Sequence, residues 1–173
     1  MSPLDQIAPV LDDQSELNMS VLMTPDMANF SGNVHGGTIL KLLDQVAYAC
    51  ASRYSGSYVV TLSVDKVNFK EPIHVGELVT FLASVNHVGR TSMEIGIRVE
   101  AQNIQKRTVR HTNSCYFTMV AVDESGKPKP IPALNLDNDW KRCRFEAAEQ
   151  RKIARLQENH HPSCSIYKKS AHS

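Results

Sequence analysis

The chain has 173 residues, of which 42% are hydrophobic and 21% are charged, a length that fits one domain with an extension and excludes two full domains. Lysine and arginine number 19 against 18 acidic residues, which argues against broad electrostatic binding of nucleic acid or an anionic membrane. Residues 1–134 carry 11 basic and 13 acidic groups, whereas residues 135–173 carry 8 and 5. We expect a loose segment over 1–15, a folded domain over 16–134, and a basic helix with a flexible tail over 135–173.

The chain shows no sign of export or membrane insertion. No apolar run approaches the roughly 20 residues of a transmembrane helix, and the first 16 residues hold four acids and no base, unlike a signal peptide. Four widely spaced cysteines form no CxxC pair: Cys50, Cys115, Cys143 and Cys164. We therefore expect reduced thiols and a cytoplasmic location.

One short segment of the tail contains potential metal ligands. His160, His161 and Cys164 lie near one another in the sequence, but no second ligand cluster accompanies them. A polar tail is the favoured interpretation, and we expect no metal site.

The first elements are a strand, a loop and a helix. Apolar residues alternate in 16–24, which predicts a strand, and the turn formers in 24–37 predict a structured loop. Residues 37–54 predict the one strong helix of the first 134 residues, and Gly56 is placed to end it. Its apolar positions cover most of the circumference, so we expect other structure to wrap around it.

Four strand-like segments follow, over residues 57–69, 77–88, 91–103 and 108–122. In the first, Val60, Leu62 and Val64 are expected on one face. The connections are too short for parallel crossovers, so the strands should pair antiparallel. One helix enclosed by one curved antiparallel sheet is an α+β hotdog fold, which leaves a sheet edge and one side of the helix to be covered by a second protomer. Residues 137–158 predict a surface helix that packs on a neighbour or frays.

Two glycines open the central helix. Gly36 and Gly37 cost helix propensity, but they leave the backbone N–H groups of the first turn accessible to a carbonyl oxygen or an oxyanion. The alternative is a tight turn that needs positive φ.

Asp44 interrupts the apolar stripe of the same helix, with Leu40, Leu43 and Ala47 three or four positions away. A carboxylate in such a place is costly unless it is partnered or used in chemistry. The alternative is a backbone partner or a place at an interface. Asp44 lies seven residues after Gly37, roughly 10 Å along the axis, so it cannot easily serve a carbonyl at its own helix start. Two antiparallel helices across a dimer axis would bring Asp44 of one subunit to the glycines of the other.

Polar residues of the preceding loop offer further candidates. Asn29 and Asn33 are suited to hold a water or a carbonyl group, or else they serve as turn residues. His35 is a possible acid or base, although packing or hydrogen bonding is favoured in a glycine-rich turn.

A turn between two predicted strands could hold phosphate. Arg90, Thr91 and Ser92 follow Gly89 and combine one base with two hydroxyls, or else form an ordinary hairpin turn. Other basic candidates, for each of which a solvated strand residue is the favoured interpretation, are Lys66, Lys70, Arg98, Arg110 and His111.

Four sequence blocks in this order resemble the acyl-CoA thioesterases of the hotdog fold: GNVHGGTILKLLDQVAYACASRYSG, VTLSVDKVNFKEPIHVGELV, VGRTSMEIGIRVEAQN and CYFTMVAVDESGKPKPIP. The similarity covers about residues 16–134 and is nearest to the YciA-type enzymes and the cytosolic brain-type acyl-CoA hydrolase. It implies hydrolysis of a thioester to free acid and CoA, without a separate cofactor. It also implies dimers with a double-hotdog unit and commonly hexamers.

The resemblance also implies roles for individual residues. It assigns the catalytic carboxylate to Asp44, a cooperating amide to Asn29 or secondly Asn33, and the oxyanion N–H to Gly37 and Gly36. It assigns the CoA-phosphate contact to Arg90, Thr91 and Ser92. General-base catalysis and direct attack by Asp44 both stay open, as do a hydroxyacyl dehydratase using His35 and a non-catalytic acyl-CoA sensor.

Overall fold

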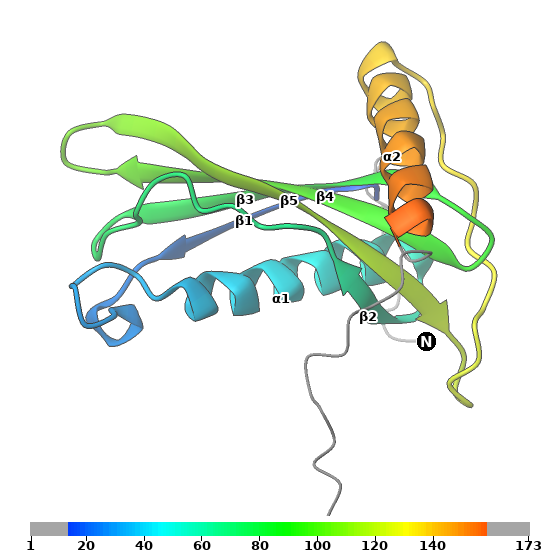
Figure 1. Cartoon of the computed structure of the whole chain (residues 1–173), viewed down its shortest axis with the longest axis horizontal. Coiled ribbons are helices and arrows are strands. Elements are labelled where there is room, and N and C mark those ends of the chain that lie inside the picture. The colour runs from blue at the N-terminus through cyan, green and yellow to red at the C-terminus, as the bar shows by residue number, and fades with distance from the viewer. Residues whose placement is uncertain (1–13, 159–173) are drawn as a thin grey trace, which may run out of the picture.

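One five-stranded sheet carries a helix on each face. The structure, a computed structural model, describes residues 14–158, and its strands are ordered β1-β3-β4-β5-β2. Figure 1 shows α1 on one face of the sheet and α2 on the other. The elements are β1 (Glu16–Leu22), the short 3-10 helix η2 (Pro25–Met27), α1 (Gly36–Ser55), β2 (Tyr58–Val64), β3 (Leu78–Val88), β4 (Ser92–Asn103), β5 (Thr108–Val122) and α2 (Asp139–Glu158).

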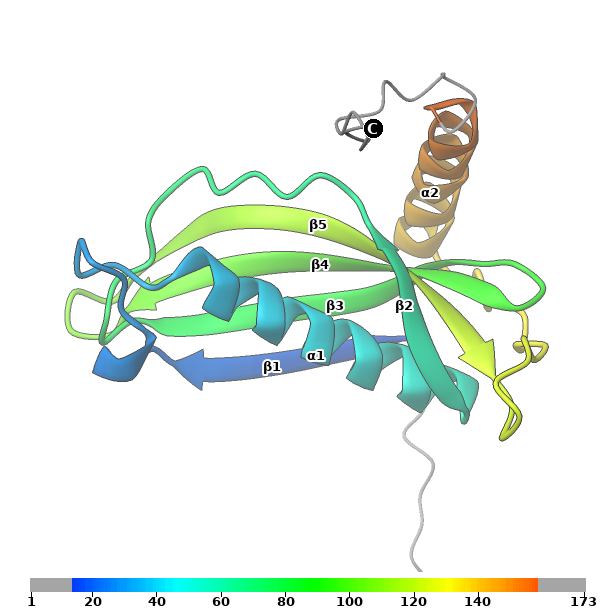
Figure 2. The ribbon, with the colours of Figure 1, turned by 60° about the horizontal axis from the view of Figure 1, so that its bottom comes forward.

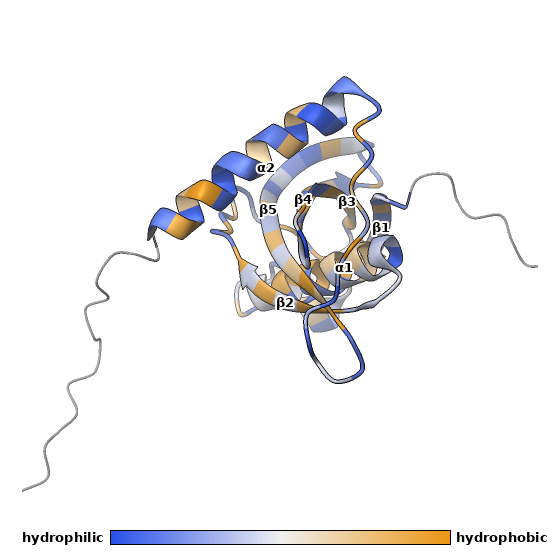
Figure 3. Ribbon diagram, turned by 90° about the vertical axis from the view of Figure 1, so that its right-hand side faces the viewer, coloured by the Kyte–Doolittle hydropathy of each residue, from blue (hydrophilic) through white to orange (hydrophobic). Residues whose placement is uncertain are grey.

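The sheet is antiparallel throughout, as the short connections predict. Alternating residues of its three central strands form the concave face and are buried: Val79, Phe81, Ala83 and Val85 of β3, Met93, Ile95, Ile97, Val99 and Ala101 of β4, and Cys115, Phe117, Met119 and Ala121 of β5. This face curls around α1, as the end-on view in Figure 3 shows. The hotdog architecture expected from the sequence is confirmed.

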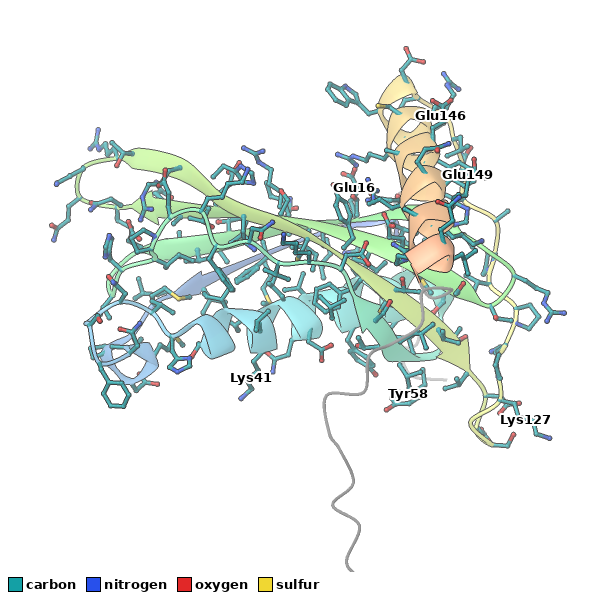
Figure 4. All side chains as sticks on the ribbon, viewed as in Figure 1. Glu16, Lys41, Tyr58, Lys127, Glu146 and Glu149 are labelled. Carbon is teal, nitrogen blue, oxygen red and sulfur yellow. The ribbon has the colours of Figure 1, made fainter. Side chains whose placement is uncertain are left out.

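The helix α1 is covered on one side only. It ends at Gly56, which adopts the left-handed conformation (φ 59°) that favours glycine. The side against the sheet is fully buried: Ile39, Leu43, Val46, Ala47, Cys50 and Ala51. Leu40 and Tyr48 are 41% exposed on the other side, and Lys41 in Figure 4 points away from the sheet. Within one chain, one side of the helix is thus left uncovered, as expected from the sequence.

The edge strand β2 is shorter than predicted, and most of its apolar side chains are exposed. It ends at Val64 rather than continuing to residue 69, and its register against β5 shifts between Thr61 and Ser63. Val59 is buried, whereas Val60, Leu62 and Val64 are 39%, 69% and 44% exposed. These three side chains, expected on one face of the strand, are therefore not part of the core that faces α1.

The helix α2 packs on the outer face of its own sheet. Ala148 is buried there, and the Phe145 ring stacks on His87 with centroids 4.6 Å apart. Arg151 donates to Glu94 at 2.6 Å, and Arg155 donates to Asp65 at 2.8 Å. Glu94 of β4 lies on the outer face of the sheet, where α2 covers it and leaves its side chain 3% exposed.

The first described residues and the cysteines are placed as follows from burial and hydrogen bonding. Ser15, expected in the loose segment, is buried, and its carbonyl accepts the Val85 N–H at 2.8 Å. Cys50, Cys115 and Cys143 are thiols that no disulfide joins within the described residues, and burial, together with the nearby charge of Asp65, raises the pKa of Cys115 to about 12.

Residues 14–158 contain no group of three potential metal ligands and no helix long and apolar enough to span a membrane. The tail residues His160, His161 and Cys164 lie outside the described residues.

Candidate active site

The loop before α1 is organised by Asn29. Its Oδ1 accepts the N–H of Ser31 at 2.9 Å and of Asn33 at 3.2 Å, while Gly32 takes a positive φ of 79°. Side-chain bonds of this kind fold the chain into a tight turn. The turn role is therefore confirmed for Asn29, and both of these bonds use its carbonyl oxygen rather than its NH2 group.

The Asn33 side chain is held by His74, a residue that the sequence did not single out. His74 Nδ1 lies 2.9 Å from Asn33 Oδ1, and the His74 backbone N–H donates to Glu77 at 2.8 Å. Arg110 binds both carboxylate oxygens of Glu77, at 2.6 and 2.7 Å. Burial raises the pKa of Glu77, but the bonds from Arg110 and His74 outweigh it and hold that pKa below its usual value.

His35 caps the start of α1. Its Nδ1 accepts the Gly37 N–H at 3.0 Å, and its carbonyl accepts the Thr38 N–H at 2.9 Å. A Cβ on Gly37 would lie only 3.2 Å from that Nδ1, and neither helix-opening glycine has a positive φ. The positive-φ alternative is thus wrong, and glycine at 37 instead makes room for the cap.

The Gly36 amide is the accessible donor at this helix end. Within the described residues its N–H has no hydrogen-bond partner, whereas the Gly37 N–H is engaged by His35. A Cβ on Gly36 would lie 3.8 Å from the Phe69 ring, which is ordinary contact. The ring of Phe69 therefore borders the first turn of α1.

Asp44 lies on the uncovered side of α1, beside β2. It is exposed in the single chain, so the expected burial of its carboxylate is not met there. Thr61 of β2 donates its hydroxyl to Asp44 Oδ1 at 2.7 Å, and Thr61 Oγ1 also lies 3.6 Å from Met119 Sδ. The sequence did not reveal Thr61, because neither periodicity nor a motif shows which residue of the strand will lie next to Asp44 of the helix.

The two halves of the predicted site occupy different pockets within one chain. Asp44 and Thr61 line a pocket of about 330 Å³. Asn29, Asn33 and Gly36 line another, of about 240 Å³, closed on one side by Phe69. Gly36 and Asp44 are eight residues apart in α1, about 12 Å along its axis. A single chain therefore does not bring the carboxylate to the helix start.

The turn that joins β3 to β4 lies at the opposite end of the sheet from the start of α1 (Figures 1 and 2). Gly89 and Ser92 close it by a backbone bond of 2.8 Å. The carbonyl of Arg90 accepts the Ile131 N–H, and that of Thr91 accepts the Ala121 N–H, both at 3.0 Å. The Arg90 side chain is exposed.

Other basic candidates are dispersed over the sheet. Arg98 pairs with Glu100 at 2.7 Å, Arg110 is committed to Glu77, and His111 Nε2 lies 2.9 Å from Ser114 Oγ. Lys66 and Lys70 are exposed in the segment after β2. The structure does not gather these groups into one phosphate site within the chain.

Similarity to known proteins decides the family. The family model of the thioesterase superfamily matches residues 31–108, a range that includes the capped helix start and Asp44. The VdlD protein of Helicobacter pylori is 53% identical over 143 residues, which cover 83% of this chain and 82% of that protein. A solved acyl-CoA thioesterase is 36% identical, and this chain covers 96% of it. The chain belongs to the hotdog-fold acyl-CoA thioesterases.

Solved members of this thioesterase family have the same fold. A hexameric acyl-CoA thioesterase crystallised without ligand superposes with a TM-score of 0.83 at 36% identity, covering 86% of this chain and 96% of its own. An acyl-CoA hydrolase from Staphylococcus aureus, in complex with butyryl-CoA and CoA, gives 0.75 at 28% identity and covers 84% and 92%. Variants of that hydrolase with one aspartate, one asparagine or one threonine replaced by alanine have also been solved.

Proposed function

We propose that the protein hydrolyses acyl-CoA thioesters to a free carboxylic acid and CoA. The observation that carries the proposal is Asp44, a carboxylate on the open side of the central helix that accepts a 2.7 Å hydrogen bond from Thr61. Support comes from the family, and from the Staphylococcus variants, whose replaced residue types are those of Asp44, Asn29 and Thr61.

In this proposal the thioester carbonyl binds at the start of α1. The N–H of Gly36 donates to the carbonyl oxygen, and the N–H of Gly37 joins it when the ring of His35 releases its bond. Helix N-termini carry about half a positive charge and stabilise a developing oxyanion. Loss of one such donor typically raises the barrier by about 3–4 kcal/mol.

Asp44 acts as the general base on a water molecule, and Asn29 positions that water, with Asn33 as the second candidate. The water oxygen forms a bond to the carbonyl carbon, its proton moves to Asp44, and the C–S bond breaks to release CoA thiolate. Because a thiolate leaves readily, no strong general acid is needed. Direct attack by Asp44 to give an anhydride is the alternative, and a single turnover in oxygen-labelled water separates the two.

The catalytic unit in this proposal is a dimer with two sites. Each site combines Asp44 of one subunit with Gly36 of the other, which accounts for the separate pockets of a single chain. The similar hexameric thioesterase supports a further assembly into trimers of dimers. Arg90, Thr91 and Ser92 hold the CoA phosphates, with Lys66 and Arg98 as further candidates. We expect no cofactor and a cytoplasmic location.

The test is release of thiol from a panel of acyl-CoA esters by the wild-type protein and by Asp44→Asn. We expect kcat to fall by orders of magnitude in the variant while binding of CoA is kept, since only the base is lost. Asp26→Asn, which makes the same change at an exposed carboxylate of the loop, is the control and should keep full activity.

Two results would contradict the proposal. No thiol release by the wild-type protein with any ester would leave the sensor as the better description, and near-normal turnover by Asp44→Asn would remove the proposed base. A dehydratase is disfavoured because the Nδ1 of His35 is already engaged in capping α1.

A further inference from the structure

Two tyrosines stand beside Asp44. Tyr48 follows it by one turn of α1, and Tyr58 begins the edge strand β2. Their rings meet edge to face, with centroids 6.0 Å apart and planes at 64°. Both rings line the pocket of about 330 Å³ that contains Asp44 and Thr61.

A second, larger pocket begins where this one ends. It measures about 620 Å³ and lies between β2 and the end of β5, and its lining includes Gly56, Val122 and Gly126. Tyr58 and Val60 line both pockets. These two side chains therefore form the partition between the space next to Asp44 and a larger space farther from it.

We propose that Tyr58, together with Val60, closes the acyl-chain pocket and so limits the length of acyl chain that the enzyme accepts. The inference rests on the proposed function, because it takes Asp44 as the residue that acts at the thioester carbonyl. The carbon chain attached to that carbonyl must then lie against the surfaces next to Asp44. Aromatic and aliphatic side chains are the surfaces on which a hydrocarbon chain is stabilised.

The charges around the two pockets distinguish the acyl chain from the CoA end of the substrate. Asp44 is in the first pocket, and Asp123, Glu124 and Lys129 line the second. This excess of negative charge disfavours the phosphates of CoA. The uncharged end of the substrate is therefore the one that this region accepts.

Tyr58 and Val60 are not core residues of the chain. Its side chain is 62% exposed in the single chain and points away from the sheet in Figure 4, and that of Val60 is 39% exposed. Neither belongs to the buried core, so truncation of either should leave the sheet and α1 in place.

The experiment compares kcat/KM for butyryl-, octanoyl-, lauroyl- and palmitoyl-CoA in the wild type, Tyr58→Ala and Tyr58→Phe. Removing the ring joins the two pockets, so in Tyr58→Ala the ratio of palmitoyl- to butyryl-CoA should rise by at least about tenfold. Tyr58→Phe keeps the ring and should keep the wild-type ratio.

Val60→Phe is the converse variant, because it adds volume at the same partition. It should lower the ratio of long to short substrates by about tenfold, and it decides the question if Tyr58→Ala fails to fold or assemble. An unchanged ratio in both variants, or an equal shift in Tyr58→Phe, overturns the inference. A wild-type protein inactive on every ester would instead overturn the proposed function.

Discussion

In the proposed mechanism, Thr61 and Asp44 form the smallest unit on which activity depends. A hydroxyl that donates to a carboxylate fixes its orientation, and a hydrogen bond to a charged group is worth about 1.5–3 kcal/mol. We expect Thr61→Val to lower kcat by about tenfold or more, with KM little changed, because a tenfold effect corresponds to about 1.4 kcal/mol. Steady-state kinetics with one good ester checks this.

Thr61→Ser is the matched control, since it keeps the hydroxyl and should retain most of the activity. An unaltered kcat in Thr61→Val would mean that the 2.7 Å contact with Asp44 has no part in positioning the base.

His35 is expected to matter for stability rather than for chemistry. Its side chain caps α1 through the Gly37 N–H, and loss of an N-cap costs about 0.5–2 kcal/mol. Chemical denaturation of His35→Ala should reveal a loss in this range, with kcat nearly unchanged. A fall of kcat by orders of magnitude with stability intact would instead make His35 an acid or base.

At this scale the sequence predicted some residues and not others. Asp44 and the two glycines were found because a carboxylate on an apolar stripe and a glycine pair at a helix start are local violations of the usual pattern. Thr61 and His74 were not predicted as site residues, because each is an ordinary residue of a strand or loop. Their roles arise only from contacts with residues 17 and 41 positions away.

Among the elements, the loop between β2 and β3 is tied to the sheet by one buried ion pair. The Glu77 side chain is 5% exposed and that of Arg110 is 29% exposed. Removing Arg110 leaves a buried carboxylate without its main partner, so we expect Arg110→Ala to lower the free energy of unfolding by about 2–3 kcal/mol. Urea denaturation checks this value.

Arg98→Ala breaks an exposed pair with Glu100 and serves as the control, with an expected loss below about 1 kcal/mol. Equal losses in the two variants would contradict the role given to Glu77. Because the pKa of Glu77 lies below its ordinary 4.5 in the folded protein, this stabilisation is complete above about pH 4.5. It is lost as the pH falls through the lower, folded value.

The packing of α2 illustrates what element-level prediction misses. Its existence and length follow from composition and helical pattern, but its position depends on Glu94, which looks like an ordinary solvent-facing strand residue. Arg151 and Arg155 form ion pairs with that carboxylate. These long-range contacts show that α2 packs on the sheet of its own chain rather than on a neighbouring subunit, and the sequence pattern does not reveal them.

For the whole molecule, the separation of Asp44 from the start of α1 predicts complementation between inactive subunits. Gly36→Val should block the free amide, and Asp44→Ala removes the base. In mixed dimers one of the two sites keeps both intact groups, so an equal mixture should regain up to about a quarter of the wild-type activity.

The measurement is thiol release after the two variants have been denatured and refolded together. Each variant refolded alone is the control and should stay inactive. Absence of any recovery, with mixed dimers present, would mean that each site is built within one subunit.

The overall architecture was predictable because its pattern repeats along the chain. Apolar residues alternate along the three central strands, and one helix is largely apolar. Few arrangements bury the apolar face of such a sheet together with such a helix. The sequence also predicted that one side of the helix would be left uncovered within a single chain. The length of β2 was overestimated, because the apolar pattern continues to Val67 and Phe69 although pairing with β5 ends at Val64.

That edge links folding to protein concentration. The backbone N–H and C=O groups on the outer side of β2 have no strand beside them in the sheet order, and an exposed apolar edge is a template for any other strand. A subunit released by dilution would thus expose Leu62 and its neighbours to misdirected pairing. Assembly would then act as protection against aggregation, in addition to completing the site.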